Sequence, residues 1–117
     1  MPENRNNLID KFVGNLSNAI VHEALFGSAE NKEAASYYKK ELDNSMRISR
    51  AYREKINPVD RTFSKEDIEY IRKRVINKSK AKLMTRILQD YPNIDLSLVE
   101  SLIDRALKEL GIAWRRS

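Results

Sequence analysis

Residues 79–112 read SKAKLMTRILQDYPNIDLSLVESLIDRALKELGI, and this stretch decides the fold. On both sides of Tyr91-Pro92, apolar residues recur at intervals of three and four, which is the spacing of one face of an α-helix. A proline cannot continue a helix and disfavours the helical conformation of the residue before it, so the chain turns there. The pattern predicts an αα-hairpin with helices over 79–91 and 96–110, the second ended by Gly111.

The rest of the chain also favours helices. It has 117 residues with three glycines and three prolines, and no segment alternates long enough to form a strand. We therefore predict one all-α domain over 1–117, a compact four- or five-helix bundle with a linker at 57–63. The expected helices cover about 8–26, 29–56, 65–77, 80–91 and 96–110. A single bent helix over 65–91 is the alternative to the third and fourth of these.

The predicted helix at 29–56 has a thin apolar face. Ser45 and Ser49 interrupt its apolar spacing. We expect this helix to be half covered and to fray or bend near Asn44-Ser45, because a helix with little apolar surface depends on its neighbours.

The end of the first predicted helix is apolar nearly all round. Val21 and Leu25 lie opposite the main apolar face of that helix, so both sides must be buried. The cover is either another helix of the same chain or a second copy of the protein. A second copy supplies it most simply, and we predict a homodimer with Val21, Leu25 and Phe26 in the interface. Trp114, next to Arg115-Arg116, is a further candidate anchor for a partner because tryptophan is enriched at binding hot spots.

Basic residues are concentrated between Ile71 and Gln89, where no acidic residue occurs. The formal net charge of the chain is +5. Such a row attracts phosphate, so nucleic-acid binding is the alternative function. Lysine- and arginine-rich helix faces are also commonly just solvated. The candidate anion contacts are Arg72, Lys73, Arg74, Lys78, Lys80, Lys82 and Arg86.

Two charged residues fall within predicted apolar faces. Glu23 lies on the face of the first helix, and Arg72 lies on the face of the helix that begins near residue 65. A buried carboxylate needs a partner, so we predict a buried ion pair between Glu23 and Arg72.

The chain carries no recognisable catalytic motif. His22 is the only histidine, there is no cysteine, and the glycines are too scattered to cradle a nucleotide. We expect no catalytic residue, no cofactor, no metal and no small-molecule substrate. A helical enzyme or metal-binding bundle is the least supported reading.

The stretch from Leu88 to Leu107 resembles the ubiquitin-binding CUE module in its aromatic-proline turn and its late leucines. The resemblance covers a third of the chain, and Tyr91-Pro92 stands where such modules usually have Phe-Pro. Because any turn between two apolar helices produces this pattern, we do not assign the chain to that family.

Composition also bounds the setting of the protein. The longest apolar run, Ala24-Leu25-Phe26, is far shorter than the roughly 20 residues that span a bilayer. The absence of cysteine is typical of a reducing compartment, so we expect a cytoplasmic protein with no membrane partner. The prediction for function is a non-enzymatic helical protein-interaction or assembly module that self-associates.

Overall fold

The computed structural model describes residues 4–57 and 63–112, and in this part of the chain every regular element is helical. The all-α prediction is confirmed, with four α-helices and one short 3-10 helix. In chain order the elements are α1 (Arg5–Gly27), α2 (Lys32–Ile56), α3 (Lys65–Gln89), η1 (Leu96–Leu98) and α4 (Val99–Glu109). Among the described residues, no helix has the length and apolar character needed to cross a membrane.

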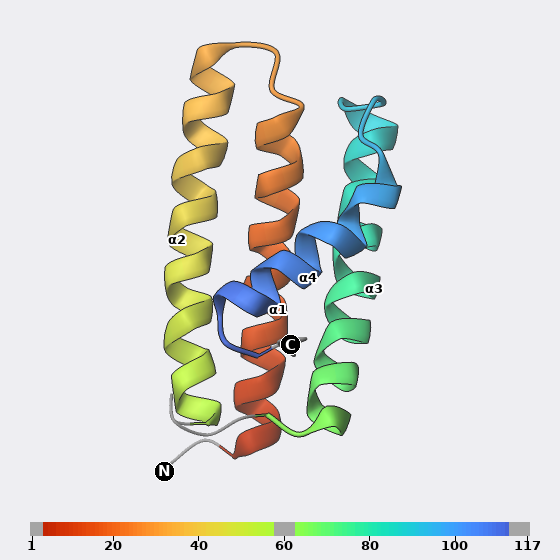
Figure 1. Cartoon of the computed structure of the whole chain (residues 1–117). Helices are drawn as coiled ribbons and strands as arrows, with labels where there is room; N and C mark the ends of the chain where they lie inside the picture. Colours follow the sequence, from red (N-terminus) through yellow and green to blue (C-terminus); the bar gives the residue numbers. More distant parts are fainter. Residues whose placement is uncertain (1–3, 58–62, 113–117) are drawn as a thin grey trace.

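The first three helices stand side by side with α1 in the middle, and α4 crosses α1 obliquely (Figure 1). Helices α1 and α3 run in the same direction, while α2 runs in the opposite one. An ion pair between Arg5 and Asp67, with a nitrogen–oxygen distance of 2.7 Å, joins the first turns of α1 and α3. The central position of α1 explains why it supplies the largest share of the core.

Side-chain caps set the starts of the three long helices. The Oδ1 atom of Asn4 accepts a hydrogen bond from the Asn7 backbone N–H at 2.8 Å, so α1 begins slightly earlier than expected. Asn31 caps α2 in the same way. Ser64 caps α3 by accepting from the Asp67 backbone N–H at 3.1 Å.

Helix α3 continues where the sequence predicted a break. Residues 65–89 form one helix, which corrects the separate helices expected at 65–77 and 80–91. Ser79, which lies between the two expected helices, is in the middle of α3 and is fully buried. It belongs to a buried row with Ile71, Val75 and Leu83, and burial of this row favours an unbroken helix over a cap.

Helix α2 is also continuous through Asn44-Ser45, where we expected fraying or a bend. Ser45 and Ser49 are buried, and α1 is the main helix that α2 packs against. The Ser49 hydroxyl donates to the Ser45 carbonyl oxygen at 2.8 Å, so its polar atom is satisfied within the helix. The serines therefore act as small packing residues and are not gaps in the apolar face.

The predicted hairpin forms with a different geometry. After α3 ends at Gln89, the second arm begins with η1, and α4 then runs across α1 instead of lying along α3 (Figure 1). Ile103 and Leu107 on α4 are fully buried. Gly111 ends this arm as predicted, with a φ of 71°, and the Ile112 backbone N–H donates to the Leu107 carbonyl oxygen at 2.9 Å.

Candidate functional site

Two of the predicted interface residues belong to the core of a single chain. Val21 is 8% exposed and Leu25 is 1% exposed. Helices α2 and α3 flank α1 on its two sides (Figure 1), so a single chain buries both Val21 and Leu25. This corrects the prediction that Val21 and Leu25 meet a second copy. Phe26 remains 40% exposed, and Trp114 lies outside the described residues.

An apolar groove lies between the end of α1 and the start of α4. We call it the α1–α4 groove, and it has a volume of about 190 Å³. Its apolar lining comes from Ala24, Ile94, Leu98, Val99 and Leu102. Leu98 is 57% exposed, which leaves an open apolar edge.

Two carboxylates lie at this groove. Glu23 comes from α1, and Asp95 precedes η1. Asp95 caps η1 by accepting from the Ser97 backbone N–H at 2.9 Å and from the Ser97 hydroxyl at 2.7 Å. These hydrogen bonds lower the pKa of Asp95, so the groove carries a negative charge at neutral pH.

The predicted pair between Glu23 and Arg72 is not formed, and each residue pairs with α4 instead. Arg105 donates to Glu23. Arg72 pairs with Asp104, with 2.7 Å between Arg72 Nε and Asp104 Oδ1, and this hydrogen bond raises the pKa of Arg72. Because α4 crosses α1, its neighbouring residues Asp104 and Arg105 reach α3 and α1 respectively. The two pairs help to fix the position of α4.

A second hollow, of about 250 Å³, lies between α2 and α4. Its lining combines the apolar side chains of Leu42 and Met46 with charged residues that include Arg50 and Glu109. Both hollows are below the roughly 300–1,000 Å³ typical of small-molecule pockets. Their size suits individual side chains of a partner protein.

A polar aromatic cluster joins α2 to the end of α3. The Tyr38 and Tyr91 hydroxyls share a hydrogen bond of 3.1 Å, and Arg86 Nη2 donates to the Tyr38 hydroxyl at 3.1 Å. Arg86 also pairs with Asp90, with 3.1 Å between Nε and Oδ1. No local signal in the sequence could identify these partners of Tyr38, which are about fifty residues away.

His22 packs beside this cluster. Its ring stacks near Tyr38 with 6.5 Å between ring centroids, and its Nδ1 atom is buried without a hydrogen-bond partner. Desolvation lowers the pKa of His22, and the charges of Lys82 and Arg86 add to the effect against an opposing contribution from Glu41. In residues 4–57 and 63–112, no group of three or more metal-ligating side chains is assembled.

The structure divides the predicted basic residues into two groups. Four of them contact other side chains of the protein. Arg72 contacts Asp104, Arg74 contacts Asp10 and Tyr70, Lys82 contacts Asn18, and Arg86 contacts Asp90 and Tyr38. Lys73 and Lys78 are exposed and Lys80 is half-buried, and none of these three pairs with a described residue. The basic stretch is thus partly structural.

Arg53 is a structural residue that the sequence analysis did not identify. It is buried, and its guanidinium donates to the backbone carbonyl oxygens of Leu110, Gly111 and Asn57. Its position among apolar residues at helical spacing was a signal for burial, but the carbonyls that it binds could not be known from the sequence.

Models of known protein families, curated proteins and solved structures were all compared with this chain, and none of them matches it. The likeness of residues 88–107 to the CUE module therefore has no support from a family match. Arguments about function depend on the geometry of the chain itself.

Proposed function

We propose that the protein is a non-enzymatic helical interaction module that self-associates through the α1–α4 groove. The observation that carries this proposal is an open apolar groove whose Leu98 edge is 57% exposed. Exposed apolar surface of this kind marks protein interaction sites. The absence of cysteine supports a reducing compartment, so we place the activity in the cytoplasm.

The occupant that we propose is Trp114 of a second copy. Tryptophan brings a large apolar surface, and Arg115 and Arg116 follow it directly in the sequence. Their positive charges complement the Asp95 carboxylate at the groove, whereas Glu23 is already paired with Arg105. A groove on one copy that takes Trp114 of another makes a head-to-tail contact, which gives rings or chains and an average mass that rises with protein concentration.

Light scattering over a concentration series tests this proposal. The average mass of the wild type is expected to rise with concentration, and both Trp114→Ala and Leu98→Lys are expected to hold it at the monomer. Leu88→Lys is the matched control, because Leu88 is 80% exposed on α3 and does not line the groove. A wild type that stays monomeric at high micromolar concentration contradicts self-association. If Leu88→Lys lowers the average mass as much as Leu98→Lys does, the groove is not the site of self-association.

A second variant tests the charge complementarity. Asp95→Asn removes the negative charge but keeps a side-chain oxygen that can cap η1. We expect this variant to associate more weakly than the wild type at low salt and equally at high salt, since exposed charge interactions are screened. Equal association at both salt concentrations would remove Asp95 from the interface.

A further inference from the structure

The seam between α1 and α3 is built on a regular register. Asp10 contacts Arg74 and Asn18 contacts Lys82, and each pair is 64 residues apart. Because the two helices are parallel, successive turns repeat this pairing. Helix α3 therefore presents one row of cations, one per turn, formed by Arg74, Lys78, Lys82 and Arg86.

We call this row, with the residues of α1 that face it, the cationic seam. Its two ends are neutralised, because Arg74 pairs with Asp10 and Arg86 pairs with Asp90. Its centre is not neutralised. Among the described residues, Lys82 binds only the neutral amide of Asn18.

In the register of the seam Lys78 faces Gly14, which has no side chain, and an added Cβ atom there would meet nothing within 4 Å. Desolvation and the charge of Lys78 lower the pKa of Lys82, which reflects a positive charge without compensation. Like charges one turn apart destabilise a helix, so the centre of the seam would gain from a bound anion.

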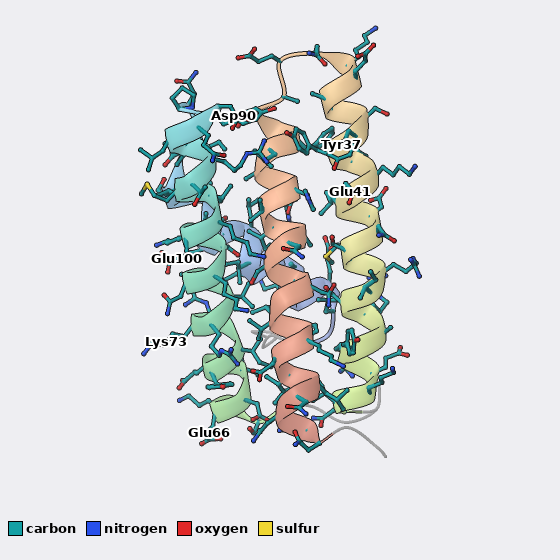
Figure 2. The ribbon with its side chains drawn as sticks, turned by 180° about the vertical axis from the view of Figure 1, so that it is seen from behind. Tyr37, Glu41, Glu66, Lys73, Asp90 and Glu100 are labelled. Atoms are coloured by element: carbon teal, nitrogen blue, oxygen red, sulfur yellow. The ribbon has the colours of Figure 1, made fainter. Side chains whose placement is uncertain are left out.

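Exposed tyrosines lie near both ends of the seam. Arg74 Nη1 donates to the hydroxyl of the exposed Tyr70 at 3.1 Å. At the other end, the exposed Tyr37 packs edge-on against Tyr38, which accepts from Arg86. Figure 2 views the molecule from behind, with α1 in front of α4 and with Tyr37 and Asp90 at the same end of the bundle.

This arrangement suits a chain of phosphates better than a single anion. One helical turn separates the cations by about 6 Å along the axis, so the row extends over several charges. Proteins that bind single strands combine such a basic track with aromatic side chains on which bases stack. Asparagine side chains such as Asn18 commonly donate to phosphate oxygens.

We propose that the cationic seam binds the phosphodiester backbone of a single-stranded nucleic acid, with Lys78 and Lys82 as central phosphate contacts and Tyr37 and Tyr70 as stacking residues. None of the seam residues lines the α1–α4 groove, so this activity is separate from the groove. Substitutions that abolish nucleic-acid binding by the seam should leave self-association through the groove intact, and the reverse should also hold.

Fluorescence anisotropy with a labelled single-stranded oligonucleotide, measured over a salt series, tests the seam. Lys78→Gln with Lys82→Gln is expected to weaken binding. It is also expected to reduce the slope of log affinity against log salt by about 1.4, because each of the two lost phosphate contacts contributes about 0.7 to the slope. Lys32→Gln with Lys40→Gln removes the same charge from exposed positions on α2 and is the matched control. An equal loss of oligonucleotide affinity in the two double variants would overturn the assignment of the binding site to the cationic seam.

Position 14 offers a second test that leaves the lysines in place. Gly14→Glu puts a carboxylate opposite Lys78, as Asp10 lies opposite Arg74, and is expected to weaken oligonucleotide binding severalfold. Gly14→Gln has the same size without the charge and is expected to bind like the wild type. Circular dichroism confirms that both variants fold. Equal affinity in the two variants contradicts the proposal.

Binding measurements on the wild-type protein also test the proposal. Absence of oligonucleotide binding at low salt would overturn the proposal. So would binding to vesicles that contain phosphatidylserine without any binding to the oligonucleotide, because this result would assign the seam to a lipid surface.

Discussion

Among single residues, Arg53 makes the most consequential set of contacts. Its Nε atom donates to the Leu110 carbonyl oxygen at 2.8 Å, and its Nη1 atom donates to the Asn57 carbonyl oxygen at 2.6 Å. The guanidinium also lies 5.1 Å from the centroid of the Phe63 ring. One cation therefore satisfies carbonyls at the ends of α2 and α4, where the helix dipoles favour positive charge.

Replacing Arg53 should have a large effect on stability. Arg53→Ala leaves these buried carbonyls unpaired, and we expect it to lower the free energy of unfolding by roughly 2–5 kcal/mol. Arg50→Ala, at an exposed position one turn away, is expected to change it by less than about 0.5 kcal/mol. Urea denaturation of both variants measures the difference, and equal midpoints would contradict the structural role of Arg53.

His22 should make stability depend on pH. Its pKa is lowered from the usual value of 6.5, chiefly by desolvation, so the unfolded chain binds a proton more readily than the folded one. This contribution to stability is complete above pH 6.5 and is lost as the pH falls from there through the folded-state pKa. His22→Gln should remove that part of the pH dependence in thermal melts between pH 5 and 8. An unchanged profile would show that another group titrates.

At the scale of elements, the pairing of α1 and α2 depends on small residues. Ser49 is fully buried, and its hydroxyl bonds within α2 and not across to α1. A larger side chain there must push the helices apart. We expect Ser49→Leu to lower stability by about 1–3 kcal/mol through overpacking and Ser49→Ala to be nearly neutral. Denaturation midpoints measure both, and a stable Ser49→Leu variant would mean that the interface has room.

Helix α3 contains the opposite case, a buried hydroxyl without a partner. Ser79 is fully buried, and its Oγ atom makes no hydrogen bond. Ser79→Ala removes this unsatisfied group and improves helix propensity, so we expect a gain of about 0.5–2 kcal/mol. Ser17→Ala is the control, because the Ser17 hydroxyl donates to the Val13 carbonyl oxygen at 2.7 Å. In thermal melts, only the Ser79→Ala variant should have a melting temperature clearly above that of the wild type.

At the scale of the whole molecule, α1 is the central helix and contacts all three other α-helices. Val21 and Leu25 are part of its buried surface. Val21→Lys with Leu25→Glu places two charges in the core, so we expect loss of the folded state and not a folded monomer. Phe26→Lys, at an exposed position on the same turn, should fold normally.

Far-UV circular dichroism with thermal melting distinguishes these outcomes. A double variant that keeps its helix content and its cooperative melt would show that Val21 and Leu25 are not needed to bury α1. That result would return both residues to the list of interface candidates.

The sequence by itself determined the all-α class and several helix boundaries. The Ser64 cap, the end at Gly111 and the turn at Pro92 were all predictable, because each depends on residues within about one turn of the helix. The apolar periodicity of α1 was equally local, and this helix supplies the largest share of the core.

The tertiary structure alone decided how these elements meet. It kept α3 continuous through Ser79, and it covered Val21 and Leu25 within one chain. It also paired Glu23 with Arg105, a residue 82 positions away, by laying α4 across α1. Periodicity shows that a face is apolar, but not which face it meets. That choice depends on contacts between residues far apart in the chain, which no local pattern encodes.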